Sequence, residues 1–457
     1  MLPVRERHGR AREACLTRQS GFGYTRRVLD AIVIGGGFAG VTAARELTLA
    51  GLDCTLIEAR DRLGGRTWYR DWSGDDIEMG GGWVHWHQPH AWAELTRAGQ
   101  GIGQSDGAEL VSWTVNGERR SGPMAERHAI ALSAWDRFVA PAHEALPRPH
   151  DPLFALSALA PLDAQTIAQR IAELGLGDAE RDVLSAELEA LAHGYLDDAG
   201  AVSVLRWHAL SGYTLELTQE TGGVYTFGAG TRGLIDAMAA EAPFAQWLST
   251  PVDSIGSVAG GVEVRTRKGD VLQARTCVLA VPLNVLPDIA FDDLSSVKRD
   301  AIALGQASRG IKLWLRVRGE SRGINAVAPA HPFGYLMTDR ILPDGSQLLV
   351  GFGRDAAVVD ADDRDALQTS LDALMPGLEI VDAITHDWLA DEFARGTWAI
   401  HRPGWYTRHH ANMRGPEHGL VFAGSDLADG WSGFVDGAIE SGLRAANQVR
   451  ALLRPGS

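Results

Sequence analysis

The chain has 457 residues, of which 45% are hydrophobic and 22% are charged, a composition typical of a globular protein long enough for two domains. It has no run of about 18 apolar residues, so we expect no membrane partner. The formal net charge of −15 argues against a nucleic-acid partner, which needs a basic surface. An acidic surface can concentrate cationic substrates, an effect that follows the local field and not the total charge. Of three widely spaced cysteines, Cys15, Cys54 and Cys277, the last two fall on expected strands. We therefore predict buried thiols and a cytoplasmic protein.

The first 27 residues differ from the rest, with seven arginines, two acids and no apolar stretch of the signal-peptide type. We predict a disordered tail over residues 1–27, or an extension from an upstream start site. An organelle-type transit peptide is the alternative. Arg26-Arg27 directly precedes the first expected strand, which argues against a twin-arginine export signal.

Residues 30–58 have the order of a dinucleotide-binding unit: an apolar strand, a G-x-G-x-x-G turn, a helix over 41–50 and a second strand over 54–57. In such a turn Gly35 makes the tight bend, Gly37 lets the backbone approach a pyrophosphate, and Gly40 lets the helix pack on the strand. Glu58 lies 21 residues beyond Gly37, where a carboxylate can accept hydrogen bonds from ribose.

The segment that follows, RDRLGGRT over residues 60–67, adds two glycines and three arginines. It resembles the signature of the FAD-dependent amine oxidase superfamily, in which this segment contacts the diphosphate and the flavin. The cofactor residues expected in this part of the chain are Gly35, Gly37, Phe38, Ala39, Gly40, Glu58, Ala59, Arg60, Gly64, Gly65 and Arg66.

Glycines and tryptophans then follow in GGGWVHWHQPHAW, residues 80–92. The resemblance implies that Gly81, Gly82, Trp83 and Val84 lie against the isoalloxazine ring. His85, His87 and His90 could suggest a metal site, but no cysteine or acid follows at ligand spacing, so we predict no metal. This stretch and PRPHDPLF, residues 147–154, are similar to the bacterial nicotine and pseudooxynicotine amine oxidase branch.

A mainly helical insert is expected from residue 124 to 217, with apolar periodicity over 164–174 and 181–191 and glycines between the two. Such an insert is similar to the helical part of a substrate domain. Leu191, His193 and Tyr213 are candidates to face its cavity, and ordinary core packing is the alternative for each.

Strands return over residues 252–282, and further sheet is expected over 347–354 and 381–393. The resemblance places Val252 near the adenine. Lys312 lies in the strand-like stretch SRGIKLWLRVRG, where a lysine is usually a solvated, outward side chain. The family, however, commonly has a lysine here that holds a water against flavin N5.

The C-terminal third supplies the remaining family motifs. Trp388 matches a tryptophan near the flavin, and Thr397 stands where some relatives carry a cysteine bound covalently to FAD, so we predict FAD held without a covalent bond. Trp398 and Phe434 match the two positions of an aromatic cage, with core packing as the alternative. The stretch GLVFAGSDLADGWSGFVDGAIESGLRAA resembles the closing strand–turn–helix motif, whose expected FAD contacts are Gly424, Ser425, Asp426, Gly433, Phe434, Val435 and Ala438.

The predicted fold class is α/β: a discontinuous, GR2-type, Rossmann-like FAD-binding domain and an α+β substrate domain of mixed sheet and helices. The FAD domain is expected over residues 28–85, 222–285 and 415–457. The substrate domain is expected over 86–221, mainly helical, and 286–414, mainly sheet.

The resemblance implies oxidation of a primary or secondary amine on an aromatic or heterocyclic group. Hydride passes to flavin N5, the imine product hydrolyses, and oxygen or an electron-acceptor protein takes the electrons. Leu191, Tyr213, Trp398 and Phe434 are the expected substrate contacts, and Lys312, Trp398 and Phe434 the expected catalytic residues. Two alternatives remain: an L-amino-acid oxidase, although no arginine can be assigned to a substrate carboxylate, and an FAD-loaded electron carrier without turnover. Family likeness alone suggests a homodimer.

Overall fold

A computed structural model describes residues 16–17, 25–26 and 28–454 of the chain. In the tail, strands β1 (Leu16–Thr17) and β2 (Thr25–Arg26) pair antiparallel. The rest of residues 1–27, and with it the predicted disorder, lies outside the described residues. Within the described ranges, no helix is both long and apolar enough to cross a bilayer.

The first of two large sheets is built around the dinucleotide-type unit. Its strands run in the order β11 (Ala245–Trp247), β4 (Cys54–Ile57), β3 (Leu29–Ile34), β14 (Val271–Leu279), β13 (Gly261–Thr266), β12 (Val252–Val258) and β15 (Ala290–Phe291), with β21 (Leu420–Phe422) also paired to β14. Strands β11, β4, β3, β14 and β21 are parallel neighbours, whereas β12 to β14 form an antiparallel meander. β3 and β4 are almost wholly buried, as strands of a parallel sheet covered on both faces are.

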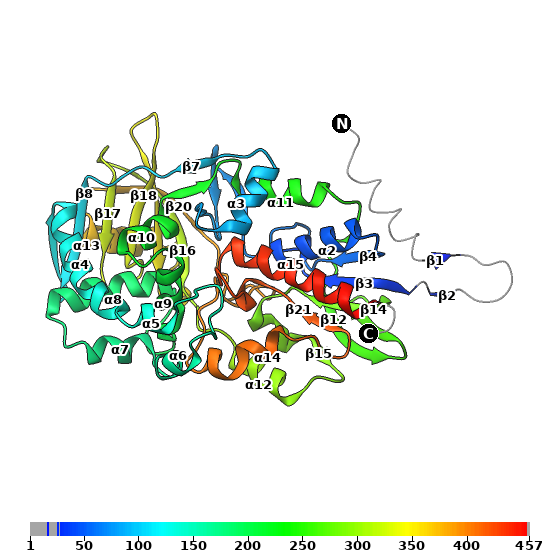
Figure 1. The fold of residues 1–457 in the computed structure, drawn as a ribbon. Coiled ribbons are helices and arrows are strands. Elements are labelled where there is room, and N and C mark those ends of the chain that lie inside the picture. The colour runs from blue at the N-terminus through cyan, green and yellow to red at the C-terminus, as the bar shows by residue number, and fades with distance from the viewer. Residues whose placement is uncertain (1–15, 18–24, 27, 455–457) are drawn as a thin grey trace.

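Helices from both ends of the chain cover this sheet. α2 (Phe38–Leu49) and α15 (Val435–Leu452) pack side by side, the first blue and the second red in Figure 1. A Cβ added at Gly442 would lie 2.5 Å from the carbonyl oxygen of Ala39, so only glycine permits this approach. α3 (Pro89–Arg97) lies against α15 and α11 (Gly230–Ala240), on the same side of the molecule.

The second large sheet is mainly antiparallel. Its strands run in the order β20 (Glu379–Thr385), β16 (Ile311–Arg318), β19 (Gln347–Gly353), β18 (Tyr335–Ile341), β17 (Ile324–Val327), β8 (Leu110–Val115) and β9 (Glu118–Gly122), and only the β17–β8 pair is parallel. β16 lies inside this order and is buried along most of its length. Its lysine, Lys312, is therefore a core side chain and not the solvated one that the strand pattern alone suggests.

A group of helices packs beside the second sheet, on the left of Figure 1. They are α4 (Met124–Val139), α5 (Ala142–Ala145), α6 (Leu156–Asp163), α7 (Ile167–Glu173), α8 (Asp178–Ala192), α9 (Ala201–Leu210) and α10 (Leu215–Gly223). α7 and α8 confirm the two helices predicted from apolar periodicity. They are separated at Gly175, whose φ of +57° suits glycine.

Shorter elements connect these layers. Two small antiparallel pairs are β5 (Tyr69–Trp72) with β6 (Asp75–Glu78) and β7 (Ile102–Gln104) with β10 (Tyr225–Phe227). The remaining α-helices are α12 (Ser296–Leu304), α13 (Arg364–Leu374) and α14 (Ala411–Arg414). There are also short 3-10 helices, η1 (Leu283–Asp288), η2 (Ala356–Val358) and η4 (Ser425–Leu427), and a π-helix, η3 (Tyr406–His410).

The predicted α/β class is confirmed, but one predicted stretch of sheet is wrong in part. Strand β20 stops at Thr385, and residues 386–393 form turns and not sheet. The reason is local, because the carboxylate of Asp387 accepts the backbone N–H groups of Leu389 and Ala390. These bonds fold the chain back and leave those N–H groups unable to join a ladder.

Candidate active site

One long cavity receives residues from both large sheets and from the helical group. Its lining leaves about 2290 Å³ free of protein atoms, part of which is open to solvent. The glycine-rich turn and the residues after β4 line one part of it, and residues of α4, α8, α9 and α10 line another. Strands β16, β18 and β19 and the loop 388–398 contribute as well.

The first part of the cavity has the features of a nucleotide site. α2 begins at Phe38 with its N-terminus beside the cavity, and its first backbone N–H groups are free to face a phosphate. Glu58 is buried and accepts backbone hydrogen bonds from Gly36 at 2.5 Å and Arg60 at 2.7 Å. Burial raises the pKa of this carboxyl, against the opposing effect of those bonds. A Cβ at Gly40 would lie 1.8 Å from the carbonyl oxygen of Gly35, so this glycine permits helix–strand packing.

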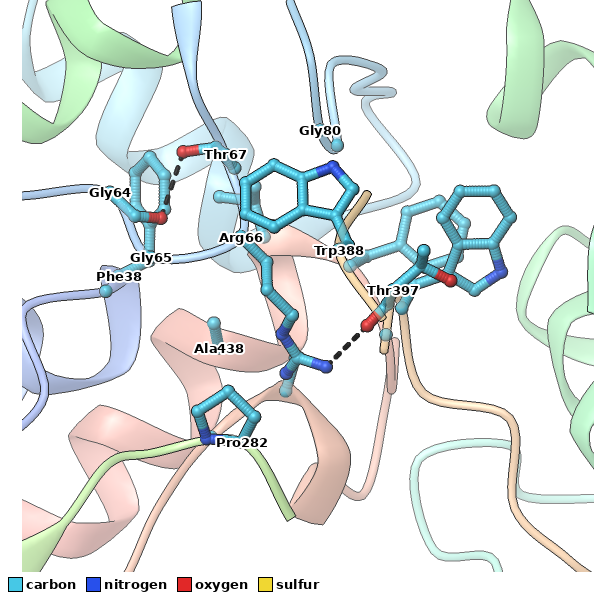
Figure 2. Close-up of a pocket in the computed structure, with 18 of the residues that line it drawn as sticks. Phe38, Gly64, Gly65, Arg66, Thr67, Gly80, Pro282, Trp388, Thr397 and Ala438 are labelled. Carbon is cyan, nitrogen blue, oxygen red and sulfur yellow. Dashed lines mark hydrogen bonds between the residues drawn. The ribbon is translucent and has the colours of Figure 1, made fainter. Parts of the chain in front are cut away.

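Arg66 joins its own segment, residues 60–67, to the loop at Thr397 and to the turn at residues 425–426. Its Nη1 donates to the carbonyl oxygen of Thr397 at 2.6 Å, and its Nη2 donates to the Ser425 hydroxyl at 3.0 Å and pairs with Asp426. Figure 2 shows the Arg66 side chain reaching Thr397, with Trp388 on one side and Pro282 on the other. Although burial opposes ionisation, Arg66 holds the pKa of Asp426 below its usual value.

Lys312 points into the cavity from β16 and is only 3% exposed. Its Nζ donates to the carbonyl oxygen of Gly80 at 2.9 Å and lies 4.5 Å from the ring centroid of Trp83. Burial lowers the pKa of Lys312 to about 8, although the nearby Glu78 raises it. Glu78 is buried too, and its carboxylate accepts the N–H groups of Trp68 and Gly80.

Trp398 is held in place from behind by His193. The two rings are stacked, with centroids 4.2 Å apart, and Trp398 Nε1 donates to the carbonyl oxygen of Leu191 at 2.8 Å. His193 Nε2 faces the carbonyl oxygen of Ile311, which can only accept, so Nε2 carries the proton and Nδ1 accepts from the Thr397 hydroxyl. Burial lowers the pKa of His193 to about 4, so the ring is neutral near pH 7.

Phe434 enters the same cavity as the N-cap of α15. Its ring packs edge-on against Trp207 and Trp431, with centroids 5.3 Å and 5.2 Å away. The acid in the first turn of α15, Asp436, faces away to cap α3, where it accepts the N–H groups of His90 and Ala91. The N-terminus of α15 therefore keeps its positive end beside the cavity.

The glycines of the lining leave room for a bulky planar group. A Cβ at Gly81 would meet no protein atom within 4 Å, and one at Gly37 would meet only the Cα of Gly65, at 3.8 Å. Added side chains at these positions would project into space that the fold leaves open. The lining therefore has room for a flavin dinucleotide, which the N-terminus of α2 and residues 81–83 could hold.

No group of three or more His, Cys, Asp or Glu side chains in the described part of the chain could hold a metal ion. Two of the three histidines weighed as ligands have carboxylate partners, since His85 Nε2 contacts Glu220 at 3.0 Å and His90 contacts Asp436. Nδ1 of the His87 ring is buried without a hydrogen-bond partner.

Most of the residues singled out from the sequence do line this one cavity. They are Gly35, Gly37, Phe38, Ala39, Glu58, Ala59, Arg60, Gly64, Gly65, Arg66, Gly81, Gly82, Trp83, Leu191, Val252, Lys312, Trp388, Trp398, Gly424, Ser425, Gly433, Phe434, Val435 and Ala438. Gly40, Val84 and Asp426 are buried behind the lining. His193, weighed as a cavity residue, also lines it.

Tyr213 is the predicted substrate residue that the fold does not bring to the cavity. It follows α9 with a φ of +63°, and its ring stacks on His143 with centroids 4.0 Å apart. Its hydroxyl donates to the carbonyl oxygen of Leu146 at 2.7 Å. Tyr213 is thus a packing residue, the alternative weighed for it from the sequence.

Other lining residues were not singled out from the sequence. They include Trp135, Glu187, Trp207, Thr218, Tyr335 and Phe352, and further residues of other strands and of the loops between them. The sequence pattern could have singled out Glu187, because it is an acid on an otherwise apolar helix face, four residues from Val183 and four from Leu191. The others had no local signal, because aromatic residues and threonines on helices and strands are commonly packed in the core.

Comparison with known proteins settles the family. A family model described as flavin containing amine oxidoreductase matches residues 38–450. The chain belongs to the flavin-containing amine oxidoreductases. It is 37% identical to pseudooxynicotine dehydrogenase of a Pseudomonas species, over 93% of this chain and 87% of the relative. It is 30% identical to (S)-6-hydroxynicotine oxidase of Paenarthrobacter nicotinovorans, over 92% and 99%.

Solved structures agree on the fold of this amine oxidoreductase. Wild-type putrescine oxidase bound to putrescine matches with a TM-score of 0.80 and 22% identity, over 93% of this chain and 99% of the other. Cyclohexylamine oxidase from Brevibacterium oxydans matches with a TM-score of 0.78, 21% identity and 94% and 100% coverage. The protein is an FAD-dependent enzyme that acts on amines.

Proposed function

We propose that this amine oxidoreductase oxidises a primary or secondary amine carried on an aromatic or heterocyclic group, with nicotine and pseudooxynicotine as models of the substrate. The observation that carries this proposal is the meeting of Trp398, Phe434 and Lys312 on one cavity. Two relatives support the substrate class by their names. They are the pseudooxynicotine dehydrogenase of a Pseudomonas species, at 37% identity, and the nicotine dehydrogenase of Pseudomonas putida, at 35%.

Bound FAD would supply the acceptor for a hydride from the carbon next to the amine nitrogen, and the imine so formed would hydrolyse. The protein supplies orientation and exclusion of water. Trp398, fixed by His193 and by the carbonyl of Leu191, and Phe434, fixed by Trp207 and Trp431, flank the amine. Aromatic faces also attract a cationic amine by about 0.5–2 kcal/mol before it loses its proton.

Lys312 has the role of a proton-handling residue. Its ammonium is bound to Gly80 and faces the rings of Trp83 and Phe352, and burial brings its pKa to about 8. A group with such a pKa can hold and exchange the proton of a nearby water near neutral pH.

The alternative of an L-amino-acid oxidase requires an arginine free to bind a carboxylate. The three arginines of the described lining are all paired: Arg60 with Asp391, Arg66 with Asp426 and Arg267 with Glu392. This pairing favours an amine without a carboxylate.

Anaerobic mixing of the FAD-loaded protein with a substrate panel tests the proposal. Bleaching of the flavin band by aryl-alkyl amines supports it. Bleaching by L-amino acids alone would instead indicate the amino-acid oxidase, and no bleaching by any compound would indicate an electron carrier. Repeating the turnover with oxygen or with a dye acceptor then identifies the oxidant, since the relatives include both dehydrogenases and an oxidase by name.

A further inference from the structure

One acidic side chain of the cavity has no partner. Glu187 on α8 lines the cavity and is 6% exposed. Its Oε1 is buried without a hydrogen-bond partner, and among the described residues no Lys, Arg or His nitrogen lies within 4.0 Å of its carboxylate. Glu189, two residues further on, shows the usual arrangement, with the backbone N–H of Ala330 and the guanidinium of Arg354 on its two oxygens.

A buried carboxyl without a partner costs free energy, and such groups are rare in folded proteins. Arg127 does not supply the missing partner. Its two terminal nitrogens donate to the side-chain oxygen of Asn325 and contact the sulfur of Met124, its Nε has no partner of its own, and no nitrogen of it lies within 4.0 Å of the Glu187 carboxylate. Burial raises the pKa of Glu187, although the charges of Arg127 and His128 oppose the shift. The free protein thus keeps an unsatisfied polar group on the wall of its cavity.

The position of Glu187 relative to the ring pair follows from the helix geometry. Glu187 lies four residues before Leu191, which is about 6 Å along the helix axis and on the same face. The carbonyl oxygen of Leu191 accepts the bond from Trp398. Trp135 and Tyr335 line the cavity with Glu187 and are mainly hydrophobic. A molecule held at Trp398 and extended along α8 would therefore reach Glu187 through apolar surroundings.

We propose that Glu187 binds a second nitrogen of the substrate, remote from the C–N bond that is oxidised. The ionised carboxylate accepts a hydrogen bond from a protonated amine or pyridinium, and the protonated carboxyl donates one to a neutral ring nitrogen. This proposal rests on the proposed function. Among aryl-alkyl amines, Glu187 would select those that carry a nitrogen at the end remote from the oxidised C–N bond. The proposal names Glu187 as a specificity-determining residue and not a catalytic one.

Matched substrates test the proposal. A 3-pyridyl-alkyl amine and the phenyl amine of the same chain length differ only in the distal nitrogen. We expect the FAD-loaded wild type to favour the pyridyl compound in kcat/KM by about 10- to 100-fold, and Glu187→Leu to abolish that preference while leaving the phenyl compound as good a substrate as before. Glu187→Gln keeps a donor, so we expect it to retain part of the preference for the neutral ring.

Glu189→Gln is the control, since it alters a buried acid of the same helix that does not line the cavity. It should keep the pyridyl preference. An equal preference in wild type and Glu187→Leu would overturn the proposal, and so would an equal loss with both substrates in Glu187→Leu, because that indicates a structural role.

A binding measurement separates this proposal from the proposed function. The 3-pyridyl and phenyl alcohols of the same chain length cannot be oxidised as amines, and their binding can be followed by the change in flavin absorption. We expect the pyridyl alcohol to bind more tightly to the wild type and equally with the phenyl alcohol to Glu187→Leu. If no amine bleaches the flavin but this difference is seen, the proposed function fails and the role of Glu187 stands. If the two alcohols bind the wild type equally, the role of Glu187 fails.

Discussion

Lys312 shows how burial can adjust a single residue for chemistry. An exposed lysine is charged at any physiological pH, whereas Lys312 is nearly fully buried and burial brings its pKa to about 8. Below about pH 8 the side chain is protonated, and above it the amine is neutral. Any flavin half-reaction that depends on Lys312 should therefore change rate across this range.

We expect Lys312→Met to slow one flavin half-reaction on the order of 10²-fold while FAD stays bound, because the methionine fills the space but handles no proton. The inflection near pH 8 in that rate should disappear. Stopped-flow measurement of both half-reactions over pH checks this. Lys268→Met, an exposed lysine, serves as the control. If both rates and both pH profiles match the wild type, Lys312 has no part in the reaction.

Thr397 is the single residue on which the prediction of non-covalent flavin binding rests. Its hydroxyl is bonded to His193 and its carbonyl to Arg66, and a hydroxyl cannot form the thioether that a cysteine would. Of the three cysteines, Cys54 and Cys277 are buried in the first sheet. We expect acid precipitation to release all the flavin into the supernatant, as measured by its absorption. Flavin that stays with the pellet would contradict this expectation.

At the scale of elements, the contact between α2 and α15 positions two helix N-termini on the same cavity. Gly442 makes the close contact possible, because a Cβ at this position would lie only 2.5 Å from the carbonyl oxygen of Ala39 and 2.7 Å from the Cβ of Thr42. Any shift of α15 away from α2 moves Phe434 and the N-terminus of α15 relative to the glycine-rich turn before α2.

We expect Gly442→Val to lower the free energy of unfolding by about 1–3 kcal/mol and to weaken FAD binding, because overpacking separates the two helices. Thermal unfolding and FAD titration of the apoprotein measure the two effects. Ala451→Val places the same side chain on an exposed position of α15 and controls for the lower helix propensity of valine. Equal behaviour of the two variants would show that the contact tolerates a larger residue.

Element-scale features also show what the sequence can predict. The first strand, glycine turn and helix were predictable because turn residues and apolar runs within about 20 residues define them. The end of β20 was not, because it depends on which backbone N–H groups the Asp387 side chain accepts. Nothing local distinguishes Tyr213, which stacks on His143, from Leu191, which lines the cavity. Glu187 and Tyr335 meet only through the packing of α8 on the second sheet.

At the scale of the molecule, the core of the first sheet encloses two thiols. Cys54 on β4 and Cys277 on β14 lie on either side of β3. Burial raises the pKa of Cys54 to about 12 and also raises that of Cys277. A thiol with such a pKa, out of contact with solvent, reacts only when the fold opens.

We expect a Cys15→Ser variant to show no reaction with an aromatic disulfide reagent in the native state, and reaction of both remaining thiols in denaturant. This background is needed because Cys15 lies outside the described residues. The slow native-state rate then reports the opening of the first sheet, and FAD should slow it further since the cofactor binds only the folded form. Rapid labelling without denaturant would show that one thiol is accessible.

The first sheet is completed only by residues near the end of the chain. β14 pairs with β3 from the beginning and with β21 from the end, and Arg66 finds its carboxylate partner at Asp426. A nascent polypeptide that has left the ribosome as far as residue 400 thus carries the whole glycine-rich turn. It still lacks β21, Asp426 and α15, and with them one wall of the cavity. Loading of the vitamin-derived cofactor must then await the synthesis of β21, Asp426 and α15.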